Sequence, residues 1–131
     1  MPAELIPDDV REFIINQIDS IVELEALLIL CKNSETEWSV RDLSERLYAG
    51  EAQTQQALAK LHSAGLLITA NNGPTAYRYE PKTQEQREMV DRVAEIYSRL
   101  LIPVTNLIHA KSENKVQQFA DAFKLRKRTD K

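Results

Sequence analysis

Side chains that can form paired hydrogen bonds with nucleic-acid bases are concentrated in one short segment of the chain. Gln53, Gln55, Gln56 and Lys60 lie within eight consecutive residues. A glutamine amide can pair with adenine through two hydrogen bonds, and a lysine can contact guanine or a phosphate. Because glutamine is also a good helix former, the same residues fit an ordinary solvated helix face. The cluster therefore allows two interpretations, a base-reading surface or a polar face without a ligand.

Two arginines near this segment could add contacts to a nucleic-acid backbone. Arg41 stands near the start of the preceding predicted helix, and Arg78 is the only basic residue of a predicted hairpin. An arginine suits a phosphate or a narrow minor groove. Arg78 fits a cross-strand surface charge just as well. The complete set of candidate DNA-binding residues is Arg41, Gln53, Gln55, Gln56, Lys60 and Arg78.

The residue types that carry most enzyme and metal chemistry are isolated in this sequence. Cys31 is the only cysteine, and it stands in an apolar run that predicts core packing. His62 and His109 have no partner at a spacing that would hold a metal ion. The sequence has no phosphate-binding loop, nucleophile elbow or HExxH motif. We therefore expect no enzyme activity, no metal and no cofactor.

Two short helices are predicted to position the candidate residues. Ser39 is a suitable N-cap for the first, and Asp42, three residues later, is its acidic capping partner. A break at Tyr48–Gly50 separates it from a second helix, predicted from about Glu51 to Ser63. We expect Gly50 to supply the positive φ that a tight turn between helices needs. The cluster of glutamines then lies on the second helix.

A β-hairpin is predicted directly after the second helix. Gly65 stands where a helix commonly ends in a glycine. Leu66–Thr69 and Ala76–Tyr79 have the composition of two strands, and Asn71–Pro74 between them has the composition of a turn. The order of elements is therefore helix, turn, helix and hairpin.

The segment from Ser39 to Tyr79 resembles the winged-helix module of bacterial transcription regulators such as the MarR, ArsR and PadR types. The residues that carry the likeness are Thr54, Leu58, Leu61 and the pair Gly65-Leu66. The likeness implies a mainly α-helical α+β fold, a winged helix-turn-helix with a small β-hairpin as its wing. It also implies that the second helix enters the major groove of duplex DNA. A fold does not by itself establish a function, and some winged helices bind only proteins.

Two further helices are predicted before this module. The first runs from Pro7 or Asp8 to about Gln17 and has acidic residues at its start, which suits the helix dipole. Residues 21–31 are too apolar for a surface helix and predict a central buried one, with Ser20 as N-cap and Glu23 at capping-box spacing. Trp38 is expected to begin a short strand against the wing.

The chain after Pro81 is predicted to form a helical extension. Residues 83–102 have apolar positions three and four apart, and Pro103 should kink this helix or separate it from the next. Ser112 is a suitable N-cap for a last helix at about 113–124, followed by a basic tail. We therefore divide the chain into a winged-helix domain, residues 1–81, and an extension, residues 82–131.

Regulators of the resembled type often pair through such helices, so we expect a homodimer built mainly from residues 83–123. The alternative is a monomer in which the extension folds back on the winged-helix domain.

The distribution of charge weakens the DNA-binding interpretation. Residues 1–38 carry nine acidic and two basic side chains, residues 39–80 carry four of each, and residues 110–131 carry three acidic and seven basic ones. The predicted reading head is therefore neutral, whereas lysine and arginine usually supply much of the affinity for DNA. A protein-interaction module with the winged-helix shape is the main alternative, and a protein partner would then replace DNA.

Two further expectations concern effectors and location. A small molecule bound between the reading head and the extension is a third possibility, with Trp38, Tyr48 and Tyr97 as candidate pocket residues. No segment approaches the roughly 20 apolar residues of a membrane span, so we expect no membrane insertion. The N-terminal residues lack the basic and apolar regions of a signal peptide, which favours a cytoplasmic location.

Overall fold

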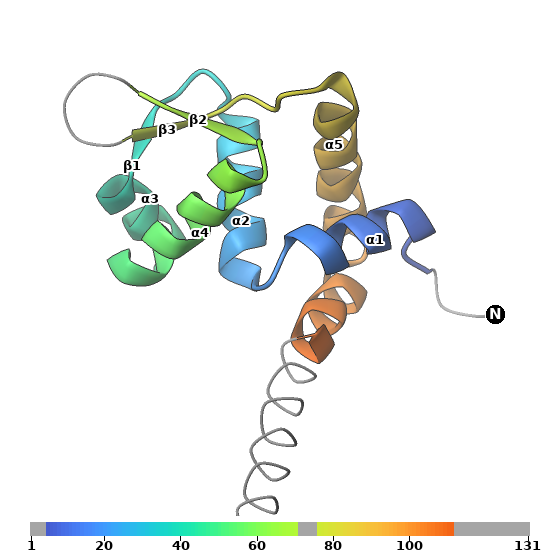
Figure 1. Ribbon diagram of the computed structural model, residues 1–131. Helices are drawn as coiled ribbons and strands as arrows, with labels where there is room; N and C mark the ends of the chain where they lie inside the picture. Colours follow the sequence, from blue (N-terminus) through green and yellow to red (C-terminus); the bar gives the residue numbers. More distant parts are fainter. Residues whose placement is uncertain (1–4, 71–75, 112–131) are drawn as a thin grey trace, which may run out of the picture.

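The computed structural model describes residues 5–70 and 76–111, which form a helical body with a small antiparallel sheet (Figure 1). The helices are α1 (Asp8–Gln17), α2 (Ile21–Lys32), α3 (Val40–Leu47), α4 (Glu51–Ser63) and α5 (Gln84–Arg99), and a further helix covers residues 101–111. The strands are β1 (Trp38–Ser39), β2 (Leu67–Thr69) and β3 (Ala76–Tyr79). The predicted turn at Asn71–Pro74, the last helix at 113–124 with its cap Ser112, and the basic tail lie outside the described residues. The predicted fold class, mainly α-helical α+β, is confirmed.

Helix α2 lies at the centre of the molecule, as its apolar sequence predicts. Its side chains Leu24, Leu27 and Leu30 are fully buried in a core shared with α1, α4 and α5. Ser20 caps the helix, because its hydroxyl accepts a hydrogen bond from the Glu23 backbone N–H at 3.2 Å. The Glu23 carboxylate turns back to the backbone N–H of Asp19 at 2.9 Å, one residue before the cap. None of the helices in the described ranges has the length and apolar character needed to cross a membrane.

The turn between α3 and α4 differs from the prediction. Gly50 has an ordinary φ of −67° and serves as the N-cap of α4, while Tyr48 takes the left-handed conformation with φ 56°. Tyr48 ends α3 this way because its own N–H and that of Ala49 then close back on Glu45 and Ser44. The expectation that Gly50 supplies the positive φ is therefore wrong. The predicted cap of α3 is confirmed, since the Ser39 hydroxyl accepts from the Asp42 N–H at 3.0 Å.

Gly65 ends the second helix in the left-handed region, as predicted, with φ +84°. Its carbonyl accepts a hydrogen bond from the Lys82 N–H at 3.0 Å, which ties the end of α4 to the segment before α5. A Cβ at this position would meet the Lys82 side chain at 3.1 Å. The positive φ therefore favours glycine here, and a larger residue would also have to displace the Lys82 side chain.

The three strands form one antiparallel sheet in the order β1-β3-β2. The short strand predicted at Trp38 is confirmed, because Trp38 pairs with Tyr77 of β3. Strand β3 alternates in the usual way, with Tyr77 and Tyr79 facing the core and Arg78 facing outward. The sheet therefore joins the segment before α3 to the hairpin after α4.

The C-terminal helices pack against the same core. Helix α5 begins at a capping box formed by Thr83 and Gln86 and ends at Leu100. Residues 101–111 then form the next helix, with Pro103 in its first turn, where a missing N–H removes no helical hydrogen bond. The expected break near Pro103 is thus confirmed. The buried side of both helices joins the core cluster through Val90, Val93, Ile96, Leu100, Val104 and Ile108.

Candidate nucleic-acid interface

Helix α4 exposes a long outward face that is free of bulky apolar side chains. Its buried side holds Thr54, Ala57, Leu58 and Leu61. On the opposite side Ala52, Gln56, Ala59 and Ser63 are all exposed and follow one another at steps of four, three and four. Residues at these steps share one face of a helix. Gln56 is therefore the long polar side chain in the middle of a strip of small residues.

The other two glutamines lie on the flanks of this strip. Gln55 stands seven residues before His62, on the side that faces the sheet, and its Nε2 donates to the Tyr77 hydroxyl at 3.3 Å. His62 packs edge-on against the same Tyr77 ring, with ring centroids 6.0 Å apart. Gln53 is exposed on the opposite flank, seven residues before Lys60. The three candidate glutamines therefore share one helix but do not share one environment.

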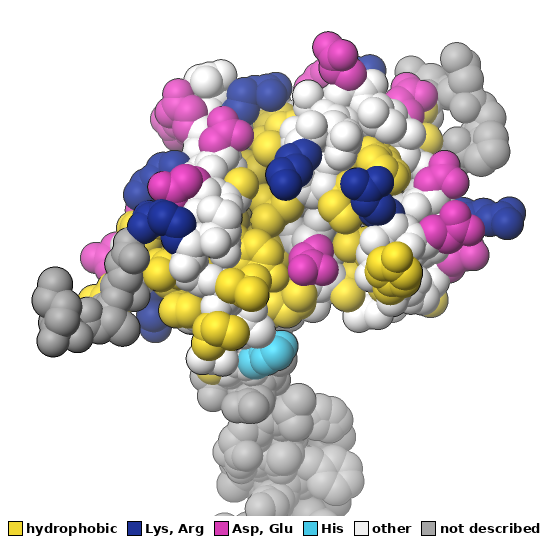
Figure 2. All heavy atoms as spheres, turned by 180° about the vertical axis from the view of Figure 1, so that it is seen from behind, with side chains coloured by type: hydrophobic (Ala, Val, Ile, Leu, Met, Phe, Trp, Pro, Cys, Tyr) yellow, Lys and Arg dark blue, Asp and Glu magenta, His cyan; other side chains and the backbone are white. Residues whose placement is uncertain are grey.

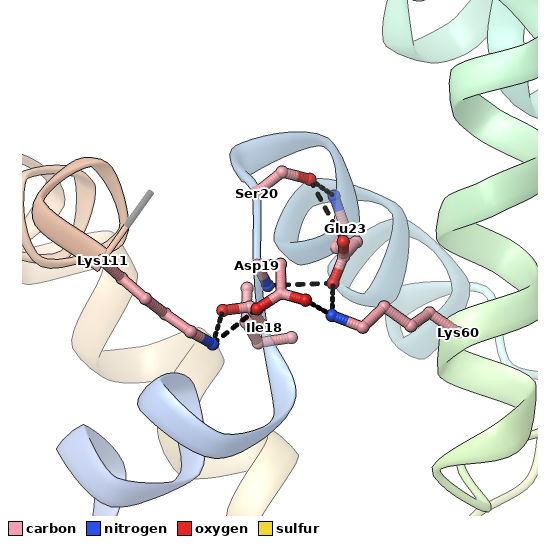
Figure 3. Close-up of polar contacts among 6 residues, drawn as sticks. All are labelled: Ile18, Asp19, Ser20, Glu23, Lys60 and Lys111. Carbon is pink, nitrogen blue, oxygen red and sulfur yellow. Dashed lines mark hydrogen bonds and ion pairs between the residues drawn. The ribbon is translucent and has the colours of Figure 1, made fainter. Parts of the chain in front are cut away.

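Lys60 points from α4 toward the junction between α1 and α2, as Figure 3 shows. Its ammonium forms an ion pair with Asp19 and lies 3.6 Å from a carboxylate oxygen of Glu23. The Glu23 side chain is only 10% exposed, so this contact is partly shielded from water. Lys60 thus already has two carboxylate partners within the chain.

The two candidate arginines also lie beside carboxylates. Arg41 is within 3.8 Å of Glu45 one turn along α3, and both side chains are well exposed. Arg78 on β3 lies 3.2 Å from Glu80, with the arginine side chain 36% exposed. Exposed pairs of this kind are weak, so a phosphate can replace the carboxylate at small cost. Among the described residues, Arg41, Lys60 and Arg78 form no uncompensated positive strip. The spacing of Arg41 with Glu45 and of Arg78 with Glu80 could have indicated their pairs, whereas nothing in the sequence connects Lys60 with Asp19 and Glu23.

Comparison with solved structures identifies the architecture. A MarR family protein from Bacillus stearothermophilus superposes with a TM-score of 0.51 at 20% sequence identity, over 94% of this chain and 84% of that one. A MarR family transcriptional regulator from Streptomyces coelicolor gives 0.50 at 20% identity, over 93% and 89%. A transcriptional regulator from Thermotoga maritima gives 0.51 at 13% identity, over 93% and 85%. The chain has the winged helix-turn-helix fold. No protein-family model and no curated protein matches the sequence.

In winged-helix terms, α3 and α4 are the helix-turn-helix and β2 and β3 are the wing. The core pattern that carried the resemblance is in place, because Thr54, Leu58 and Leu61 are buried and Gly65 ends α4. Helix α4 is therefore the second helix of the helix-turn-helix. Helices α3 and α4 and the strands β2 and β3 lie next to one another in Figure 1.

A groove of about 460 Å³ lies between α2, the end of α3 and α5. Tyr48 and Tyr97 line it, together with Leu28, Ile29 and Leu47, whereas Trp38 lies elsewhere on β1. In Figure 1, α4 lies in front of α2. Figure 2 shows the opposite face of the molecule, where hydrophobic side chains form a band between groups of charged ones. Two of the three residues expected to line an effector pocket are thus found in one groove.

Cys31 also borders this groove and is half-buried rather than fully in the core. Its sulfur lies 3.8 Å from a carboxylate oxygen of Asp91. Burial, and to a smaller extent the negative charge of Asp91, raise the pKa of the Cys31 thiol. A raised pKa keeps the thiol protonated at neutral pH, which is the opposite of what an activated cysteine requires. Among the described residues no group of His, Cys, Asp and Glu side chains could hold a metal ion.

Proposed function

We propose that this protein is a DNA-binding transcription regulator that reads duplex DNA with α4. The observation that supports this most directly is the outward strip of α4, in which Gln56 is flanked by Ala52, Ala59 and Ser63. Small residues on both sides allow a helix to approach base edges closely. The fold likeness to proteins described as transcriptional regulators supports the same reading.

The residues of the recognition helix then have distinct roles. Gln56 pairs with adenine through two hydrogen bonds, and Ala52 and Ala59 can contact thymine methyl groups. Gln53 contacts bases at the side of the DNA major groove that α4 occupies. Gln55 contributes mainly by holding the helix against Tyr77 of the wing. Sequence selectivity therefore depends chiefly on Gln56 and Gln53.

The three basic candidate residues have roles other than base reading. Arg41 and Arg78 give up exposed carboxylate partners and contact phosphates on either side of the groove. Lys60 stays with Asp19 and Glu23 and holds α4 in place. Because only a few phosphates are neutralised by each reading head, the affinity of one head is modest.

A homodimer compensates for this modest affinity, because two heads bind one DNA molecule together. Large apolar side chains remain exposed on the helices outside the reading head: Leu101 is 50%, Ile102 64% and Ile15 37% exposed. A partner subunit would cover them. A two-fold dimer presents its recognition helices about 34 Å apart, which fits a palindromic site.

Fluorescence anisotropy tests the proposal. The probe is duplex from the region upstream of the protein's own gene, the control is a scrambled duplex, and both are titrated over a salt series. We expect preferential binding that weakens steeply with salt and is reduced by Arg78→Ala. Equal binding to both duplexes, lost by physiological salt, would contradict the proposal.

A protein-interaction module is a second candidate, and one observation favours it. Arg41, Lys60 and Arg78 each lie beside a carboxylate, while the groove between α2, α3 and α5 offers an apolar surface. In that case DNA binding is absent even at low salt. The same anisotropy titration therefore separates the two candidates.

A further inference from the structure

One carboxylate connects the recognition helix to the C-terminal helix of the described chain. Asp19 lies in the short link between α1 and α2, and its two oxygens face different elements (Figure 3). One oxygen pairs with Lys60 of α4. The other lies 2.7 Å from the ammonium of Lys111, the last residue that the structure describes.

The contact to Lys111 is anchored on the backbone as well. The Lys111 ammonium donates a hydrogen bond to the Ile18 carbonyl at 2.8 Å, and its side chain is only 16% exposed. A lysine seldom gives up hydration to this extent without fixed partners. The end of the helix 101–111 is therefore held against the α1–α2 link at a defined point.

Asp19 is itself held in place. Its backbone N–H donates to Glu23 at 2.9 Å, and Glu23 also faces Lys60. The Asp19 side chain is 28% exposed, so water screens its two ion pairs only in part. Removing the Asp19 charge would leave the Lys60 and Lys111 ammonium groups around one neutral side chain, and they would repel each other. The α1–α2 link is thus a point at which one carboxylate contacts both α4 and the helix of residues 101–111.

We propose that Asp19 is a positioning residue that fixes the angle of the recognition helix relative to the C-terminal helix, and so sets the half-site spacing that the dimer accepts. This inference rests on the proposed function, since half-site spacing has meaning only for a DNA-binding dimer. If the extension helices join the subunits, any looseness between them and α4 is passed on to the distance between the two recognition helices.

The first test needs no DNA. Amide hydrogen exchange is measured on the full chain for the parent, Asp19→Asn, Lys111→Met and the control Lys32→Met, which removes an exposed lysine of α2. We expect Asp19→Asn to speed exchange in both the helix 101–111 and the last turns of α4 at least about tenfold, because exchange follows local opening. Lys111→Met speeds exchange in 101–111, and Lys32→Met leaves both segments unchanged. Unchanged exchange in 101–111 of Asp19→Asn would overturn the inference.

The second test measures spacing on DNA. The parent selects duplexes from a random library, and the selected site is then remade with one or two base pairs added to or removed from its centre. We expect the parent to bind the original spacing about tenfold or more tightly than the altered spacings. For Asp19→Asn we expect this ratio of affinities to fall below about threefold. Affinity for a single half-site should be equal in both proteins, which a variant that merely unfolds would not show.

The outcomes separate the inference from the function. A parent that selects no sequence defeats the proposed function and the inference with it. A parent that selects a two-part site, together with an Asp19→Asn variant that retains the spacing preference, defeats the inference alone. A parent that selects only single half-sites, with no spacing preference, also defeats the inference while DNA binding stands.

Discussion

The Gln55 amide donates a hydrogen bond of 3.3 Å to the Tyr77 hydroxyl, and this contact joins α4 to strand β3 of the wing. Tyr77 is 6% exposed, and its ring packs edge-on against His62. His62 follows Gln55 by two turns of α4, on the same side of the helix. The aromatic ring therefore fixes one flank of α4 against the sheet. Gln55, which the sequence predicts as a base-reading residue, thus also has a partner within the chain.

Replacement of Gln55 should therefore affect stability more than base selectivity. Gln55→Ala removes this donor from the hydroxyl of the buried residue Tyr77, and we expect a loss of about 1 kcal/mol in the free energy of unfolding. Tyr77→Phe should cost a similar amount, and the double variant little more than either single one. Urea unfolding of the four proteins measures this coupling. Additive losses would mean that the two side chains do not depend on each other.

Gln56→Ala is the complementary variant. Gln56 is exposed and lies on the outward strip of α4, so its loss should leave the stability within about 0.5 kcal/mol of the parent. Loss of one bidentate base contact should weaken binding to the selected duplex by about tenfold or more. Binding to a scrambled duplex should not change. If anisotropy shows the same loss on both duplexes, Gln56 does not read sequence.

The turn between α3 and α4 provides a stability prediction that separates the structure from the sequence pattern. Gly50 is the N-cap of α4, has no side-chain cap and has open space where a Cβ would be placed. Gly50→Ser should therefore supply a capping hydroxyl and raise the free energy of unfolding by about 0.5 to 1 kcal/mol. Thermal unfolding followed by circular dichroism measures it.

Gly65→Ala is the control for that variant. Gly65 has a positive φ, and a Cβ there would press on Lys82 at 3.1 Å. We expect a loss of about 1 to 2 kcal/mol. If Gly50→Ser lowered stability as much as Gly65→Ala, Gly50 would have the positive φ that the sequence pattern predicted, and the turn described here would be incorrect.

The local parts of this fold could be predicted from sequence, and the contacts between distant parts could not. Ser20, Ser39 and Gly65 take the predicted capping roles because the side chain or the missing Cβ acts on backbone within three or four residues. The positive φ of Tyr48 could not be predicted, because bulky side chains rarely take the left-handed conformation.

The electrostatic surroundings of Lys60 show the same limit at longer range. Its partners Asp19 and Glu23 stand about forty residues earlier in the chain, so no spacing rule connects them. Only the packing of α4 against α2 brings these charges together. For the same reason sequence reasoning could count the charges of the reading head but could not tell which of them face solvent alone.

Cys31 allows a prediction about pH. Burial raises the pKa of its thiol above the ordinary value of 9.0, so the folded state favours the protonated thiol. A group with a raised folded pKa contributes stability that is complete below its unfolded pKa and is lost as pH rises through its folded pKa. Burial and the nearby Glu25 likewise raise the pKa of Tyr97 above 10.0. Stability should therefore begin to fall above about pH 9, with Cys31 first to contribute.

Alkylation of Cys31 measures the same shift directly. The native protein and the protein in denaturing urea are treated with iodoacetamide at pH values from 7.5 to 10, and the modified fraction is followed by mass spectrometry. Since Cys31 is the only cysteine, each rate belongs to one thiol. We expect the native rate to rise at higher pH than the unfolded rate, because the thiolate is the reacting form.

Asp91→Asn should shift the rate profile of the native protein toward lower pH, closer to the unfolded profile, since Asp91 lies 3.8 Å from the sulfur and its charge opposes ionisation. Glu51→Gln, which removes an exposed acidic charge in the first turn of α4, serves as the control variant. If the native rate rose at the same pH as the unfolded rate or at a lower pH, the thiol would be activated, and a redox role for Cys31 would replace the core packing that the sequence predicts.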